Sequence, residues 1–344
     1  MDNRNNNTLN NHINDIERAL VSVIIPCFNG AEVIDDSIGS VYEQDYPNIE
    51  LIVVNDGSTD NSGGLILAWK DKFEQKGFRF QYVYQPNRGL AGAIDTGLKS
   101  VTGDYLTLLD ADDFFLPGSI RKRAAFLDDH KDYAGVRTNG WIQKGSGKTL
   151  FITSEKEKTT TDYFNALIFD AAANWAGSYM VRTELLFAFY PDRNIYPSRF
   201  GQNMQIILPL AYKRKFGLID EPLMVYVVHD NSLSQASSTD NKRKKDDQNF
   251  YGYHDIYRHM VEIIIQDEKE KARYLNVLNS WVFRHECEKA INDNNKGELK
   301  SNYRQLVLTG QAKLEDKIKY HTFIHSPMAL FYRMKRKIIN DKHK

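Results

Sequence analysis

Short apolar runs of strand length alternate with segments of helical periodicity over the first third of the chain. The predicted strands cover residues 21–25, 49–55, 80–84 and 105–109, and the predicted helices cover residues 32–43, 65–73, 89–100 and 119–129. Strands that alternate with helices in this order favour a mainly parallel sheet covered by helices on both faces. We therefore expect an α/β fold.

Polar turns follow each of the four predicted strands, and their side chains carry the candidate chemistry. These residues are Asn29, Asp56, Asp60, Arg88, Asp110 and Asp112. Sheets of this kind bind ligands outside the carboxyl ends of their strands, so the six side chains are expected to converge in space. The alternative for any single position is an ordinary turn residue, because Asn and Asp fill turns without a ligand.

The end of the fourth strand is unusually acidic. Asp110, Asp112 and Asp113 follow the apolar run 105–109 within four positions. Carboxylates at the end of a buried strand are costly unless a positive group lies among them. Mg²⁺ and Mn²⁺ both prefer carboxylate oxygens. A divalent metal site is therefore one interpretation, and an acidic turn that caps the next helix is the other.

Composition narrows the class of protein. The 344 residues are long enough for one large domain or two, and 45 basic residues balance 45 acidic ones, which gives no support for a nucleic-acid partner. Cys27 and Cys287 are far apart, which predicts no disulfide framework and fits a reducing cytoplasm. No apolar run approaches the ~20 residues that span a bilayer. We predict a cytoplasmic location.

Four sequence blocks then indicate a family. VSVIIPCFNG, IELIVVNDGSTD, QPNRGLAGAIDTG and GDYLTLLDADD, in this order and spacing, resemble the family 2 glycosyltransferases with the GT-A fold. The resemblance implies a nucleotide-sugar donor, UDP-linked by preference, Mn²⁺ or Mg²⁺ as cofactor, and inversion at the anomeric carbon. It also implies an acceptor hydroxyl on a glycan or lipid-linked molecule, in cell-surface polysaccharide synthesis. A nucleotidyltransferase typically has a Gly-rich, basic first turn, which residues 26–30 lack.

The resemblance also implies roles for single residues. Pro26 and Phe28 match the turn that flanks the base and ribose, and Asp56 matches the acid that contacts the uracil ring. Asp110 and Asp112 match the first and last acids of the family's DXD motif. In that motif Asp112 would hold the metal, and Asp110 would face the ribose or the metal.

Three further positions are assigned more loosely. Asn29 and Arg88 lie in the neighbouring turns and are predicted to contact the donor by their position alone. His229 matches a position that binds the metal or the diphosphate in some members of the family. A neutral imidazole suits Mn²⁺ as a third protein ligand. The alternative for His229 is a loop histidine at the end of a strand.

The stretch Ser198–Tyr212 departs from the family at the general base. Gln202 and Asn203 stand where the family has Glu-Asp, and an amide has no useful basicity. Three hypotheses follow. The base is another residue, with Asp192 and His229 as candidates; Asn203 only orients the acceptor; or the protein binds sugar nucleotides without turnover.

The remaining patterns predict how the chain is divided. We expect a disordered leader at 1–17, a GT-A domain at 18–232 with a donor half (18–118) and an acceptor half (119–232), a mobile loop at 233–249, and a helical region at 250–344. The basic run 121–123 is expected to form a solvated helix face. Residues 328–344 are amphipathic and basic, which fits either peripheral contact with the inner face of a membrane or a packed C-terminal helix.

Overall fold

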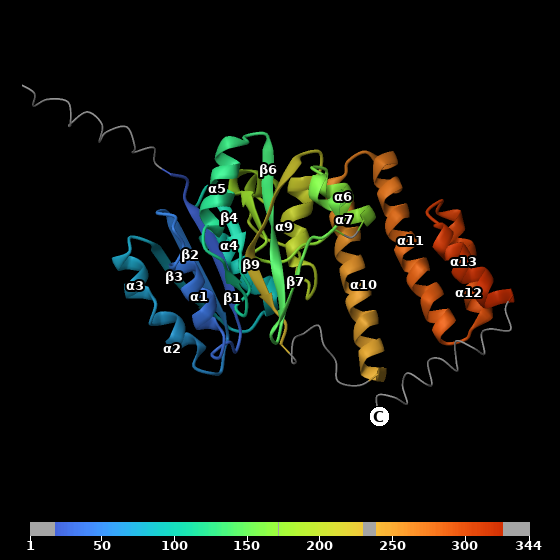
Figure 1. Cartoon of the computed structure of the whole chain (residues 1–344), viewed down its shortest axis with the longest axis horizontal. Helices are drawn as coiled ribbons and strands as arrows, with labels where there is room; N and C mark the ends of the chain where they lie inside the picture. The colour runs from blue at the N-terminus through green and yellow to red at the C-terminus, as the bar shows by residue number, and fades with distance from the viewer. Residues whose placement is uncertain (1–17, 171, 230–238, 326–344) are drawn as a thin grey trace, which may run out of the picture. The chain divides into compact units, whose positions relative to one another are not determined.

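The computed structural model describes residues 18–170, 172–229 and 239–325 (Figure 1). The chain forms two compact units that divide after Ile256. The predicted leader 1–17 and the predicted membrane contact 328–344 lie outside the described residues, as does the first part of the predicted loop, up to residue 238. Within the described residues, no helix is both long enough and apolar enough to span a bilayer.

The first unit is built on a nine-stranded sheet. Eight strands follow the order β3-β2-β1-β4-β8-β6-β9-β5, and β7 pairs with β6. The strands are β1 Val21–Cys27, β2 Ile49–Asp56, β3 Arg79–Gln85, β4 Tyr105–Leu108, β5 Phe114–Phe115, β6 Tyr133–Lys144, β7 Gly147–Leu150, β8 Tyr179–Arg182 and β9 Lys215–Val227.

The direction of the strands separates the two halves of this sheet. β3, β2, β1 and β4 are all parallel, as predicted for the first third of the chain. β8 runs antiparallel to both β4 and β6, whereas β9 runs parallel to β6. The sheet is therefore mixed, and the prediction of a mainly parallel sheet holds only for its first four strands. The short strand β8, inserted in the opposite direction, joins the two halves.

Ten helices of the described chain begin within the first unit. They are α1 Ile34–Tyr42, α2 Ser62–Leu67, α3 Lys70–Gln75, α4 Gly89–Ser100, α5 Ser119–Asp129, α6 Glu155–Thr159, α7 Tyr163–Asp170, α8 Thr183–Phe189, α9 Gln202–Ala211 and α10 Thr239–Ile264. The helices predicted at 89–100 and 119–129 are confirmed. The single helix predicted at 65–73 is wrong, because α2 ends at Leu67 and α3 begins at Lys70.

The prediction of a mobile loop at 233–249 is wrong for residues 239–249. These residues form the first part of α10, which continues without a break to Ile264. Lys, Arg and Gln are good helix formers, so a polar composition does not exclude a helix. Further along α10, the fully buried Ile256 supplies the tertiary packing that most helical stability comes from.

Helices cover both faces of the parallel strands, as predicted. The side chains of Val23 and Ile25 lie in one core cluster with Ile34, Ile38 and Val41 of α1. On the opposite face, a Cβ atom added to Gly97 of α4 would lie 2.7 Å from Cγ2 of Ile24. Successive residues of a strand point to opposite faces, so β1 is buried on both sides and reads as a continuous apolar run.

The second unit is helical, as predicted for the region after residue 250. Its complete helices are α11 Glu268–Asn292, α12 Lys296–Leu308 and α13 Leu314–His325 (Figure 1). Asp267 and Asn295 cap α11 and α12 by accepting hydrogen bonds from the backbone. Arg284 of α11 donates from Nε and Nη2 to the carboxylate of Asp316 in α13, which ties the two helices together.

The prediction of a solvated basic helix face at 121–123 is wrong for Arg123. Arg123 is 0% exposed, because it shares the inner face of α5 with Ile120, Ala124 and Leu127. Burial lowers the pKa of Arg123 to about 9, which leaves the guanidinium charged at neutral pH. A helical period of 3.6 residues turns one member of a consecutive basic run inward even when its neighbours face solvent.

Backbone and hydroxyl oxygens surround the buried guanidinium. Nη1 of Arg123 donates to the carbonyls of Gly177 and Tyr179 and to Oγ1 of Thr107, each at 3.0 Å. Nε donates to the carbonyl of Ser119 at 3.0 Å. Arg123 therefore links α5 to β4, to β8 and to the segment that precedes β8.

Replacing Arg123 by Leu is predicted to destabilise the fold by about 3 kcal/mol or more, because two buried carbonyls lose their charged donor. Arg121→Leu is the matched control. Arg121 pairs with Asp45 at 2.8 Å on the surface, and exposed pairs contribute about 0–1 kcal/mol. Urea unfolding followed by circular dichroism measures both variants. Equal losses of unfolding free energy would contradict the role given to Arg123.

Candidate active site

The turns after β1 and β2 are bonded to each other. Asn29 has a positive φ of 50° and donates its backbone N–H to Oγ of Ser58 at 2.9 Å. Its side-chain Oδ1 accepts from the backbone N–H of Thr59 at 2.8 Å, and Oδ2 of Asp60 accepts from the N–H of Ala31 at 3.0 Å. Asn29 and Asp60 therefore shape this edge of the sheet through contacts within the protein.

Pro26 and Phe28 differ in their access to solvent. Pro26 is buried within β1, where it pairs with Val54 of β2. Phe28 follows β1 directly and its side chain is 52% exposed. A large apolar ring left in solvent at a ligand-binding edge of a sheet can pack against a flat ligand group. Of the two, Phe28 can make such a contact through its side chain.

Asp56 closes β2 and is buried, with 3% of its surface exposed. Its Oδ1 accepts from Nε2 of Gln85 at 2.6 Å and from the backbone N–H of Arg88 at 2.8 Å. Among the described residues, its other oxygen, Oδ2, has no hydrogen-bond partner. One oxygen thus holds the turn after β3, and the second is left as an acceptor.

Arg88 contributes to this edge through its backbone. Its N–H contacts Asp56, whereas its guanidinium lies 3.7 Å from the carboxylate of Asp95 and 3.4 Å from Oγ1 of Thr96. Both of these partners belong to α4. The sequence placed Arg88 correctly beside Asp56, but the atom that makes the contact is the amide nitrogen.

The acidic turn after β4 brings three carboxyl groups together. Burial, with a smaller contribution from the charge of Asp112, raises the pKa of Asp110 to about 7. Burial also raises the pKa of Asp112, and the pKa of Asp113 is raised well above its ordinary value by burial and by the two neighbouring acids. The described residues therefore do not supply enough positive charge for this cluster.

Asp113 is the most buried of the three, with 1% exposure. Its Oδ1 accepts from the backbone N–H of Val227 at 2.9 Å, while its Oδ2 is buried with no hydrogen-bond partner among the described residues. The bond to Val227 attaches the end of β9 to the acidic turn. His229 follows two residues later, and its Nε2 lies 3.9 Å from Oδ2 of Asp112.

The chemistry of this cluster fits a divalent cation that is bound together with a ligand. Carboxyl pKa values raised by burial and by neighbouring acids, together with a buried carboxylate oxygen that has no partner among the described residues, form a donor set that a cation would stabilise. The described residues contain no group of three or more His, Cys, Asp or Glu side chains that could hold a metal ion alone. Mg²⁺ and Mn²⁺ commonly take one or two protein carboxylates and complete their shell with phosphate oxygens.

Asn203 is brought to the same edge from the acceptor half. Gly201, with a φ of 64°, is the N-cap residue of α9, and Asn203 lies in the first turn of that helix. The hydroxyl of Tyr179 in β8 donates to Oδ1 of Asn203 at 3.1 Å. Burial and the charge of Asp110 raise the pKa of Tyr179 well above its ordinary value, so this phenol stays protonated. Tyr179 is a site residue that the sequence pattern, a buried strand, did not reveal.

The structure does not bring Asp192 to this group. Asp192 is exposed and directly precedes Arg193, whose Nη1 donates to the carbonyl of Val101 at 2.9 Å and to those of Leu98 and Lys99 at 3.3 Å. Those carbonyls end α4, and the chain then enters the amino end of β4. Asp192 therefore lies near the edge of the sheet opposite the acidic turn.

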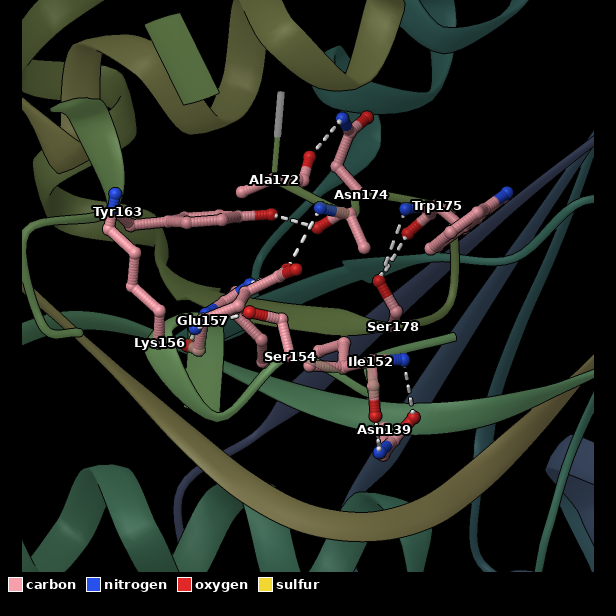
Figure 2. A network of polar contacts seen from close by, with 12 residues as sticks. Asn139, Ile152, Ser154, Lys156, Glu157, Tyr163, Ala172, Asn174, Trp175 and Ser178 are labelled. Atoms are coloured by element: carbon pink, nitrogen blue, oxygen red, sulfur yellow. Dashed lines mark hydrogen bonds and ion pairs between the residues drawn. The ribbon is translucent and has the colours of Figure 1, made fainter. Parts of the chain in front are cut away.

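A buried ion pair supports the segment that leads into β8 (Figure 2). Nη1 of Arg137 lies 2.9 Å from Oε1 of Glu157, which Figure 2 labels, and the same oxygen accepts from the backbone N–H of Ala173 at 2.9 Å. The hydroxyl of Tyr163 donates to the carbonyl of Ala173, and the guanidinium of Arg137 covers the Tyr163 ring at 3.9 Å. Ala173 is thus fixed on both sides, six residues before Tyr179.

The profile of glycosyl transferase family 2 matches residues 22–185. An uncharacterised glycosyltransferase of a Nostoc species is 29% identical over 231 residues, which cover 65% of this chain and 70% of the relative. Five uncharacterised rickettsial glycosyltransferases are 38–39% identical over 33–43% of this chain. The matches span only 18–46% of the length of those five relatives.

Solved structures share the fold at lower identity. The structure of S. aureus TarS 1–349 in complex with UDP-GlcNAc has a TM-score of 0.60 and 18% identity, with 92% of each chain covered. The mannosyltransferase PcManGT from Pyrobaculum calidifontis in complex with GDP-Man and Mn²⁺ has a TM-score of 0.50 and 17% identity, with 94% of this chain and 81% of that chain covered. The fold is therefore GT-A, and the profile match identifies residues 22–185 as a family 2 glycosyltransferase segment.

Proposed function

We propose that this protein is an inverting glycosyltransferase that transfers a sugar from a UDP-linked donor to a hydroxyl of a glycan or lipid-linked acceptor. The observation that carries the proposal is that a nucleobase acceptor and an acidic turn lie at the same edge of the sheet. Asp56 offers an acceptor oxygen at the end of β2, and the acidic turn after β4 lacks compensating charge. The UDP-GlcNAc complex of TarS supports this class of donor.

The uracil ring would lie against Asp56. Uracil carries an N–H group in its ring plane, and Oδ2 of Asp56 is an acceptor whose carboxylate is already oriented by Gln85 and Arg88. The exposed ring of Phe28 provides an apolar surface at the same edge. An acceptor that is buried and oriented before binding discriminates strongly between ligands that do and do not offer an N–H group.

Asp112 and His229, with Asp110 beside them, would hold Mn²⁺ or Mg²⁺ together with the diphosphate of the donor. The Mn²⁺ complex of PcManGT, which shares this fold, supports a divalent cation in the site but not the choice of residues. A bound divalent cation would neutralise charge on the leaving diphosphate. Asp113 supports the arrangement by holding the end of β9 against the acidic turn.

Asn203 would orient the acceptor. Because the Tyr179 hydroxyl donates to Oδ1 of Asn203, the amide group is oriented and its NH₂ is left to donate to an acceptor oxygen. Tyr179 itself is a poor base, since its pKa is raised. Of the two bases proposed from the sequence, His229 lies beside the acidic turn and Asp192 does not. A ring nitrogen of His229 that bound the metal could not accept a proton, so one nitrogen cannot do both.

The acceptor class and the biological setting complete the proposal. We place the enzyme in cell-surface polysaccharide synthesis on the cytoplasmic side. The basic, amphipathic pattern of residues 328–344 supports attachment to the inner face of an anionic membrane. A second candidate function, a sugar-nucleotide-binding protein without turnover, is favoured only by Gln202 and Asn203 at the position of the family's base. Release of UDP from a UDP-sugar distinguishes the two functions.

Asp56→Asn is predicted to weaken UDP binding by about 10-fold or more, because a hydrogen bond to a charged group contributes roughly 1.5–3 kcal/mol. The amide oxygen can still accept from Gln85 and Arg88, so the turn is preserved. The NH₂ group of Asn suits the ring nitrogen of cytosine, and CDP affinity should be kept or increased. Isothermal calorimetry with UDP, CDP and pyrophosphate measures the effect. Equal weakening of UDP and CDP would show that Asp56 does not contact the base.

Mn²⁺ is expected to increase the affinity of the wild type for UDP, and Asp112→Asn is predicted to reduce this increase by about tenfold or more. It should leave the metal-free protein as stable as the wild type or slightly more stable, because one of three neighbouring negative charges leaves the acidic cluster. Calorimetry with and without Mn²⁺ and thermal unfolding in a chelator measure the two effects. Asp45→Asn, at the exposed partner of Arg121, is the control. A Mn²⁺ response that survives in Asp112→Asn would contradict the metal assignment.

Asn203→Asp tests whether a general base is missing. If so, the new carboxylate should raise kcat for UDP release by about 10-fold or more, and activity should fall at acidic pH as that carboxylate becomes protonated. Asn194→Asp adds the same charge at an exposed position and serves as the control. If His229 is the base, His229→Ala loses activity and Asn203→Asp gains none. That outcome would reject the hypothesis that Asn203 replaces an absent base.

A further inference from the structure

The first part of α10 is in direct contact with the turn that begins α9. A Cβ atom added to Gly252 would lie 2.1 Å from Cδ2 of Phe200, so the Phe200 ring rests on the helix backbone. One turn further along α10, the fully buried Ile256 occupies the space beside Gly201, where an added Cβ would lie 2.9 Å from Cγ2 of Ile256. Two glycines, one on each element, therefore permit this close approach.

Tyr253 lies next to this contact, and Phe200 beside it leads through Gly201 into the first turn of α9, where Asn203 stands. The Tyr253 ring is 5.7 Å from that of Phe200, and its side chain is 48% exposed. Burial of the phenol, together with the charge of Asp110, raises the pKa of Tyr253. Asp110 acts on Tyr179 in the same way. The hydroxyl of Tyr179 in β8 donates to Asn203 in the first turn of α9, and Tyr253 of α10 packs beside Phe200, which leads into that turn, so both phenols adjoin the start of α9.

The strand order indicates which part of a donor would meet these phenols. Asp56 ends β2, Asp110 follows β4 two strands away, and Tyr179 belongs to β8, the next strand. Neighbouring strands are about 4.8 Å apart, so β2 and β4 are separated by roughly 10 Å. A nucleotide with its base at Asp56 and its diphosphate near Asp112 directs its sugar toward the side of Tyr179 and Tyr253.

We propose that Tyr253 is a sugar-binding, specificity-determining residue, delivered to the active site by the close contact of α10 with Phe200 and Gly201. Its ligand is the pyranose of the donor: the hydroxyl of Tyr253 binds a ring hydroxyl, and the exposed face of its ring packs on the sugar. This proposal rests on the proposed function, since it needs a UDP-sugar in the site. Tyr253 lies outside the family-matched residues 22–185.

The test compares affinities for UDP and for whichever of UDP-GlcNAc, UDP-glucose and UDP-galactose the wild type binds best. Tyr253→Phe should leave UDP affinity unchanged and weaken the UDP-sugar by about 3- to 10-fold, the range of one net hydrogen bond. Tyr253→Ala should weaken the UDP-sugar further and reduce discrimination among the three sugars. Tyr251→Phe is the control, because residues two apart lie on different faces of a helix.

Gly252→Ala tests whether the contact of α10 with Phe200 positions Tyr253, because it changes that contact and keeps the phenol. The added methyl group displaces α10 from Phe200, so the same selective loss of UDP-sugar affinity is expected. Gly297→Ala in α12 is its control, because an added Cβ there meets only Oδ1 of Asn295 at 3.5 Å. Circular dichroism and thermal unfolding establish that each variant is folded.

Each outcome separates this inference from the proposed function. A selective loss for the UDP-sugar supports a sugar contact by Tyr253. Unchanged UDP-sugar affinity in Tyr253→Ala, or parallel losses for UDP and the UDP-sugar in a folded variant, overturns the inference and leaves the UDP-dependent activity in place. If the wild type binds neither UDP nor any of the three UDP-sugars, the proposed function fails first.

Discussion

The crowding of three carboxyl groups at the end of β4, of which Asp113 is almost fully buried, is the constraint on which the site depends. β4 lies between β1 and β8 in the interior of the sheet, so the acidic turn that follows it is surrounded by other elements. The raised pKa values of Asp110, Asp112 and Asp113 reflect the cost of placing negative charge there. A position this unfavourable for negative charge favours a cation, and a ligand that brings one.

Other parts of the first unit hold this turn and its surroundings in place. Asp113 attaches the end of β9, and Arg123 of α5 fixes the carbonyls of Gly177 and Tyr179. The ion pair of Arg137 with Glu157 fixes Ala173. These are buried charged groups that bond to backbone atoms, and they orient the segments that connect the strands around the site.

The two halves of the sheet differ in regularity, and this difference bears on function. The pairing of β2 with β1 and β3 is continuous, whereas the pairing of β6 with β9 shifts register at three places. In the proposed function, the regular parallel half binds the nucleotide, which is the part that many sugar donors have in common. Tyr179 of β8 belongs to the second half and bonds to Asn203 of α9, and we propose that this side of the site distinguishes the sugar and the acceptor.

The local pattern of the sequence by itself determined the parallel strands β1 to β4, the helices α4 and α5, and the positions of Asp56, Asp110 and Asp112 at one edge. Those features follow from periodicity and from the rule that parallel strands end together, and both are local properties of the chain.

Tertiary structure alone decided which atoms make the contacts. It turned Arg123 inward, used the amide rather than the guanidinium of Arg88, left Asp192 near the opposite edge, and brought Tyr179 and Tyr253 to the start of α9. It also continued α10 through residues 239–249, where composition favours a loop. These outcomes depend on contacts between residues far apart in the chain, and such contacts leave no periodic signal in the sequence.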